Sequence, residues 1–287
     1  MKILKIISFI VLVLFSGIGV AFTFVFFGMQ QGVLNVPGTI IERNASFGLV
    51  PTTTQAIIEE TNGCKQELDQ SKPCAWFETA QWEVVRGGLE KDAAIINRVA
   101  KETGVSPRMI AAAVIPEQIR FFSDNREVFK RYFEPLKILA SLSQFSLGVS
   151  GIKQATAVEI EVYTNSTSSE FYPGDGYGQL IAYGETEDND NALFNRLTNE
   201  KDHYYSYLYT ALYLKQISAQ WERAGYDVSA RPDVLVTLFN LGFGASKPKP
   251  DPQVGGAAIT IGGQRYNFGY LGTLFYESDE LKSKFAQ

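Results

Sequence analysis

Histidine and cysteine are scarce in this sequence. Its 287 residues include one histidine, His203, and two cysteines, Cys64 and Cys74. A single histidine excludes most histidine-ligated metal sites, and any Ser-His-Asp or Cys-His machinery would depend on it alone. His203 stands beside a helical run, where a histidine that begins the helix and makes a local hydrogen bond is the ordinary interpretation. We therefore predict that the protein holds no metal ion and needs no cofactor.

The sequence also lacks an excess of basic residues. It has 26 Lys and Arg residues against 31 Asp and Glu residues, which gives a net charge of −5. A nucleic-acid-binding protein needs a basic face to neutralise phosphates, so we predict no nucleic-acid partner. A glycan ligand is held mainly by hydrogen bonds and aromatic faces, and the charge balance does not argue against one.

The two cysteines are separated by nine residues. They are too few for a zinc site without histidines. In an oxidising compartment they would close a short loop, and we predict a disulfide between Cys64 and Cys74. Two free thiols are the alternative.

Charge is absent from a long stretch near the N-terminus, between Ile6 and Met29. At 1.5 Å per helical residue, this run is long enough to span a hydrocarbon core of about 30 Å. Lys2 and Lys5 precede it, so the positive-inside rule places the N-terminus in the cytoplasm. We predict that residues 1–29 form an uncleaved membrane anchor. A cleaved secretory signal and a buried core helix are the alternatives.

The rest of the chain is predicted to form a stalk and one domain. Residues 30–87 contain prolines, threonines and the cysteine loop, which indicate an extended stalk. Residues 88–287 are predicted to be a single, mainly α domain with minor β structure. Apolar periodicity and helix-start and helix-stop signals predict helices over 89–103, 107–122, 127–145, 154–163, 204–225 and 232–244, a surface loop over 164–191, and a short strand pair over 257–267.

Glu117 is the first candidate for chemistry. It follows Pro116 in the helical segment AAAVIPEQIRFF, where its neighbours are Ala, Val and Ile. Desolvation on such a face raises the pKa of a carboxyl group, and a glutamic acid that stays protonated near neutral pH can donate a proton to a glycosidic oxygen. A glutamate on an apolar face is more often paired with a cation, and Arg120 and Arg126 are the available partners.

Two further segments accompany this helix. FSLGVSGIKQATA, residues 145–157, contains a Gly-rich turn that brings backbone amides close to a ligand or simply connects two elements. TLFNLGFG, residues 237–244, places Asn240 on an apolar helix, where its amide needs a partner that is either a ligand or an internal hydrogen bond.

The order of these three segments resembles the lytic transglycosylase family, which has the goose-type lysozyme fold. The resemblance covers roughly residues 88–245. Positions that match the family pattern are Glu117, Ser146, Gly148, Ile152, Thr156, Ala157, Asn240 and Gly242. It implies a lysozyme-like helical domain whose one catalytic acid/base, Glu117, cleaves the MurNAc-GlcNAc bond of peptidoglycan and leaves a 1,6-anhydro ring.

The resemblance also implies a place and a partner for the protein. The domain would act on peptidoglycan glycan strands outside the bacterial inner membrane, to which the N-terminal helix would anchor it. The residues that it implies for substrate binding are Ser146, Gly148, Gly151, Ile152, Phe239 and Asn240.

This sequence departs from the family pattern at several positions. Gln118 replaces the usual Ser, Gly151 stands where a substrate-binding Gln is common, Ser150 replaces Gly, and Phe239 replaces Tyr. These departures leave two other functions open. One is a lysozyme-type hydrolase, which needs a second carboxylate such as Glu134, Asp175 or Glu185 to activate water. The other is a non-catalytic, glycan-binding scaffold of the cell envelope.

Overall fold

A computed structural model describes residues 75–123, 146–184, 189–199 and 201–287. These residues are mainly helical, as predicted. In chain order the elements are η1 (Trp76–Glu78), α4 (Ala80–Thr103), α5 (Pro107–Ser123), β1 (Ser146–Leu147), β2 (Ile152–Lys153), α8 (Gln154–Asn165), α9 (Gly178–Ile181), α10 (Asn189–Leu197), α11 (Tyr204–Arg223), α12 (Pro232–Leu241), η2 (Phe243–Ala245), β3 (Ala258–Ile261), β4 (Gln264–Asn267) and α13 (Phe268–Glu277).

Several predictions lie outside these residues. The predicted anchor over 1–29, most of the stalk, the Cys64–Cys74 disulfide and the predicted helix over 127–145 belong to this group. Within the described ranges, no helix is both long and apolar enough to cross a membrane.

Local signals define both ends of the connection between α4 and α5. Gly104 ends α4 in the left-handed conformation, with a φ of 72°, and its N–H donates to the carbonyl of Ala100. The hydroxyl of Ser106 then accepts a hydrogen bond from the N–H of Met109 at 3.1 Å, and Pro107 is the first residue of α5. The sequence predicted both boundaries.

Helix α4 begins earlier than predicted. It starts at Ala80, where Thr79 caps it by accepting a hydrogen bond from the N–H of Trp82. Trp82 is buried against Trp76, with 4.8 Å between ring centroids, and against Phe275 of α13. Residues 75–87 are therefore part of the helical core, although the sequence assigned them to the stalk.

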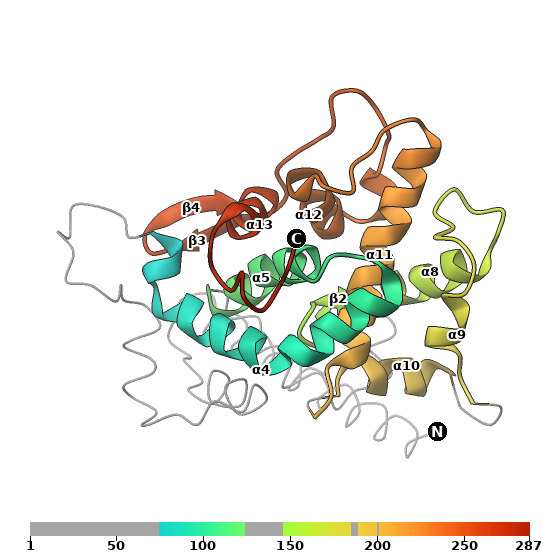
Figure 1. The fold of residues 1–287 in the computed structure, drawn as a ribbon, viewed down its shortest axis with the longest axis horizontal. Coiled ribbons are helices and arrows are strands. Elements are labelled where there is room, and N and C mark those ends of the chain that lie inside the picture. The colour runs from blue at the N-terminus through green and yellow to red at the C-terminus, as the bar shows by residue number, and fades with distance from the viewer. Residues whose placement is uncertain (1–74, 124–145, 185–188, 200) are drawn as a thin grey trace, which may run out of the picture. The chain divides into compact units, whose positions relative to one another are not determined.

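Helix α5 is the centre of the core. It contacts α4, α11, α12, α13 and β3 (Figure 1). Its side chains are buried on every face from Arg108 to Ile119, which is the pattern of a helix surrounded by protein. An added Cβ at Gly272 of α13 would lie 2.7 Å from the carbonyl oxygen of Ala112, so the two backbones touch there. The small residue Ala112 of α5 thus allows close packing of the two helices.

In the described part of the chain, two hairpins supply the β-sheets. Strands β1 and β2 pair antiparallel across the turn 148–151. Strands β3 and β4 pair with Ile261 opposite Gln264 and are joined by Gly262 and Gly263, both with positive φ, as a tight hairpin requires. The second hairpin is the strand pair predicted from the sequence. The predicted loop over 164–191 is more regular than expected, because it contains α9 and the start of α10.

Candidate functional site

Glu117 lies near the C-terminal end of α5 and is buried, with 6% of its surface exposed. The side chains that precede it, from Ala111 to Ile115, are buried apolar groups. The prediction that Glu117 follows a run of buried apolar residues is therefore confirmed. A buried carboxylate is costly unless it has a partner, so its contacts decide what it can do.

Arg120 is the partner of Glu117. Its Nη2 atom lies 2.8 Å from Oε1 and 2.6 Å from Oε2 of the carboxylate, one helical turn away. Of the two cations that the sequence offered, the structure uses Arg120; Arg126 lies outside the described residues. A general acid must present a carboxyl oxygen to the substrate, and one nitrogen of Arg120 contacts both oxygens of Glu117. Acid catalysis at this position therefore requires the ion pair to open.

The turn 148–151 lies directly against this carboxylate. Gly151 has a φ of 66°, and a Cβ built on it would be 2.3 Å from Cγ and 2.4 Å from Oε1 of Glu117. The next residue of α5, Gln118, donates its side-chain amide to the carbonyl of Val149. Two consecutive residues of α5 thus hold the turn, one by contact and one by a hydrogen bond.

Helix α11 holds the same turn from its other side. The hydroxyl of Ser150 donates to the carbonyl of Ser206 at 2.6 Å. A Cβ at Gly148 would lie 2.0 Å from the carbonyl oxygen of Leu197 and 2.5 Å from the Ser206 hydroxyl, so Gly148 serves close backbone packing. The turn is fixed between α5 and α11 before any ligand arrives.

Asn240 contacts the segment just before β3 and is connected to Glu117 only through other residues. Its Oδ1 accepts a hydrogen bond from the N–H of Ala257 at 2.8 Å. A Cβ at Gly256 would lie 2.9 Å from the same oxygen and 3.0 Å from Cβ of Phe268. The guanidinium of Arg120 in turn lies 5.9 Å from the centroid of the Phe268 ring. The internal hydrogen bond foreseen for Asn240 is present, and no direct contact joins it to Glu117.

The other predicted substrate residues lie in the core or beside it. Ile152 is buried. Phe239 is half-buried and packs edge-on against Tyr213, with 5.4 Å between ring centroids. Ser146 pairs with Lys153 in the first hairpin. Of the carboxylates considered for a hydrolase, Glu134 and Glu185 lie outside the described ranges, and Asp175 is exposed and accepts a hydrogen bond from Tyr172.

Sequence reasoning missed a buried polar cluster between α4 and α11. Oδ2 of Asp92 lies 2.6 Å from Nδ1 of His203 and accepts a hydrogen bond from the hydroxyl of Tyr207 at 2.8 Å. Burial, together with the charge of Asp92, raises the pKa of Tyr207 well above its usual value. His203 directly precedes α11, as predicted, and its contact with Asp92 joins residues that are distant in sequence. Asp92 stands between Leu89 and Ile96 at helical spacing, a signal that would have revealed a buried carboxylate.

A second carboxylate is surrounded by tyrosines. Glu161 of α8 accepts hydrogen bonds from the hydroxyls of Tyr183 and Tyr209. Burial and this carboxylate raise the pKa values of both tyrosines. Arg196 lies over the Tyr183 ring, 4.0 Å from its centroid. The Tyr183 ring is thus occupied by protein contacts.

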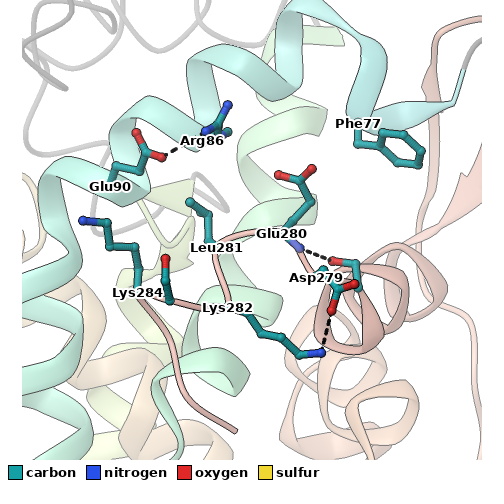
Figure 2. A pocket seen from close by; sticks show the side chains of 10 residues that line it. Phe77, Arg86, Glu90, Asp279, Glu280, Leu281, Lys282 and Lys284 are labelled. Carbon is teal, nitrogen blue, oxygen red and sulfur yellow. Dashed lines mark hydrogen bonds and ion pairs between the residues drawn. The ribbon is translucent and has the colours of Figure 1, made fainter.

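A shallow pocket lies away from these residues, between α4 and the C-terminal segment 278–284 (Figure 2). Its volume is about 650 Å³, and Arg86, Glu90, Asp279 and Lys282 are among its charged lining residues. Arg86 faces Glu90, and Lys282 pairs with Asp279, so charges of both signs alternate around it. None of the predicted site residues lines this pocket.

Comparisons with protein-family profiles, with curated proteins and with solved structures found no match for this chain. Within the described ranges, no group of three or more His, Cys, Asp or Glu side chains is placed to hold a metal ion. The arrangement around Glu117 therefore stands on its own geometry. It offers one buried carboxylate with one cationic partner, set against a glycine turn that is held in place from two sides.

Proposed function

We propose that the protein is a peptidoglycan lytic transglycosylase in which Glu117 is the single acid/base, on a goose-type lysozyme-like domain. The observation that carries the proposal is the contact between Gly151 and the carboxyl group of Glu117. It supports the proposal because the two segments that suggested the function, far apart in sequence, meet at the proposed catalytic atom. The packing of α12, which carries Asn240, against α5 adds to this support.

The reaction needs one carboxyl group and no water. Glu117 protonates the glycosidic oxygen between MurNAc and GlcNAc while the bond from that oxygen to C1 of MurNAc breaks. The 6-hydroxyl oxygen of the same MurNAc then attacks C1, and Glu117 takes the hydroxyl proton. One bond to C1 is exchanged for another, the proton returns to Glu117, and a 1,6-anhydro ring is left on the product.

The protein positions the carboxyl group of Glu117 and limits its contact with water. The apolar side chains of α5 exclude water from one side of Glu117, and the turn 148–151 closes on it from another. Arg120 must leave the carboxylate before the group can accept a proton. The ligand-free arrangement is therefore a resting state of the proposed enzyme.

A second function is favoured by the ion pair itself. If Arg120 never leaves Glu117, the carboxylate is only a structural partner, and the protein is a non-catalytic, glycan-binding component of the cell envelope. Binding to the wall would then be independent of any change at Glu117 that preserves its shape.

The test is digestion of purified cell wall by the full-length chain and by its Glu117→Gln variant, followed by mass analysis of the released fragments. The proposal expects anhydro-MurNAc ends from the wild type and none from Glu117→Gln. The matched control is Glu222→Gln, which changes an exposed glutamate of α11 and should digest like the wild type. Reducing ends, heavier by one water, would indicate a hydrolase. Wall binding without any product would indicate the non-catalytic function.

A further inference from the structure

Arg120 holds Glu117 with only one of its nitrogens. Nη2 contacts both carboxylate oxygens, whereas the strongest arginine–carboxylate pairs use two parallel N–H···O bonds from two nitrogens. In the described part of the chain, Nε and Nη1 of Arg120 have no hydrogen-bond partner. The pair is thus made with half of the guanidinium, and the other half is available to a second acceptor.

Arg120 is the more exposed partner of the pair. Its side chain is 17% exposed, about twice the 8% of Glu117. The guanidinium carbon lies 5.9 Å from the centroid of the Phe268 ring, which is fully buried. An anion from solvent therefore meets Arg120 before it meets Glu117.

We propose that Arg120 binds a carboxylate of the glycan substrate and that this carboxylate draws it away from Glu117. The identity of the ligand rests on the proposed function. Muramyl glycans carry carboxylates, either on the lactyl group or on attached peptides, whereas glycans built of GlcNAc alone are neutral. A planar guanidinium with two free donors fits a carboxylate better than a hydroxyl. The resting ion pair would then keep Glu117 inactive until a muramyl ligand arrives.

The mechanism is an exchange of partners. While Arg120 contacts both the carboxylate of Glu117 and that of the ligand, its electrostatic attraction to each of them is weaker. A ligand that engages Nε and Nη1 pulls the side chain outward, so the carboxyl group of Glu117 loses its contact with Nη2 and can face the substrate. Binding of the substrate carboxylate to Arg120 and release of Glu117 for catalysis therefore occur in the same step.

The test uses the disaccharide GlcNAc-MurNAc, because it lacks the bond that the proposed reaction cleaves. Binding is measured for its free lactyl acid and for the same sugar with that carboxyl group converted to an amide. The full-length wild type should bind the acid about tenfold more tightly than the amide, as expected when a charge-assisted hydrogen bond is gained. Equal affinity of the wild type for the two forms, together with binding of a peptide-bearing disaccharide that does not depend on Arg120, would overturn the proposal.

Variants separate the partners. Arg120→Met should lose the preference for the acid, and Arg120→Lys should retain part of it because the charge remains but the planar pair of donors does not. Glu117→Gln should bind the acid about tenfold more tightly than the wild type, because the competing carboxylate is gone. Arg98→Met, which breaks an exposed pair with Glu102 elsewhere, should behave like the wild type. If Glu117→Gln and Arg120→Met bind the acid as the wild type does, Arg120 is only a structural partner of Glu117.

Two more measurements determine which carboxylate is bound and whether Arg120 affects catalysis. A disaccharide with a peptide attached to the lactyl group should show the same dependence on Arg120 if peptide carboxylates are bound, and no dependence if the lactyl carboxylate is the ligand. In wall digestion, Arg120→Met should raise KM more than it lowers kcat. Digestion that depends on Glu117, together with equal binding of acid and amide and binding of the peptide-bearing disaccharide that does not depend on Arg120, would defeat this inference alone. Acid-specific binding through Arg120 without digestion would defeat only the proposed reaction.

Discussion

Gly151 approaches Glu117 so closely that no side chain fits between them: a Cβ at position 151 would lie 2.3 Å from Cγ of the glutamate. The contact joins a helix to a turn that is also held by Gln118 and Ser150. These hydrogen bonds hold the backbone of the turn in place, so the side chain of Glu117 is the part that must move when position 151 gains a Cβ. We therefore expect Gly151→Ala to displace the Glu117 side chain and to lower wall digestion on the order of 100-fold, since small misplacements of reacting groups carry costs of this size.

The control for this substitution is Gly225→Ala. Gly225 also has a positive φ, 87°, but a Cβ there would meet no atom within 4 Å. Both variants should lose about 1 kcal/mol of unfolding free energy from the left-handed backbone, measured by urea denaturation. Only Gly151→Ala should lose more stability than that and digest poorly. Equal stability and equal digestion of the two variants would contradict the close contact.

Arg108 should be among the most sensitive positions for stability. It is fully buried, and its guanidinium donates to the carbonyls of Phe275, Tyr276, Ser278 and Glu280 around the end of α13. Burial lowers its pKa. Arg108→Met leaves these carbonyls without donors and should cost about 3 kcal/mol or more in unfolding free energy. Arg108→Lys should lose an intermediate amount of unfolding free energy, because one ammonium group cannot reach all four carbonyls.

Exposed arginines provide the comparison for Arg108. Arg265→Lys, on the exposed face of β4, should change the unfolding free energy by less than about 0.5 kcal/mol. If Arg108→Lys is equally mild in the same urea titration, the carbonyl cluster contributes little to stability.

The cluster of Asp92, His203 and Tyr207 gives a third prediction. Tyr207→Phe removes one of two donors to a fully buried carboxylate, so it should cost about 1–3 kcal/mol of unfolding free energy. Tyr204→Phe also removes a hydrogen bond to a carboxylate, but Glu102 is partly exposed and water replaces the donor. Its cost should be clearly smaller by thermal or urea unfolding. The reverse order would show that the cluster is not important for folding.

Acid should weaken the start of α12. The hydrogen bond from Arg231 holds the pKa of Asp233 below its usual value of 3.8. A carboxyl group whose pKa is lowered by folding stabilises the protein above its unfolded pKa and loses that effect as the pH falls through the folded pKa. Asp233→Asn should therefore cost up to about 1 kcal/mol at pH 7, since the pair is exposed, and nothing at about pH 2. Urea unfolding of the wild type and of Asp233→Asn at both pH values measures this difference, and an equal difference at the two pH values would contradict the prediction.

Short-range signals account for the parts of the fold that the sequence predicted well. Gly104, Ser106 and Pro107 define a helix end and a helix start within four positions, and each acts through its own backbone or hydroxyl. Leu89 and Ile96, at helical spacing in the helix predicted over 89–103, are buried on one face of α4. The helical core begins before residue 88 because Trp82 packs against Trp76 and against the Phe275 ring of α13, contacts that periodicity does not reveal.

The site was predicted less completely, for a physical reason. The ion pair of Glu117 with Arg120 spans three positions and could be named from spacing on a helix. The partner of His203 is 111 positions away in the sequence. The N–H of Ala257, which donates to Asn240, comes close to it only in the folded chain. Partners of this kind depend on how helices are placed against one another, and residue type alone does not define that placement.

The guanidinium of Arg108 links the beginning of α5 to carbonyls as far as 172 positions later. During synthesis, α5 would therefore leave the ribosome long before its buried cation finds any acceptor. A chain shortened before Phe275 would keep every residue of the proposed site yet lack all four of these carbonyls, and the buried guanidinium would have none of them to donate to.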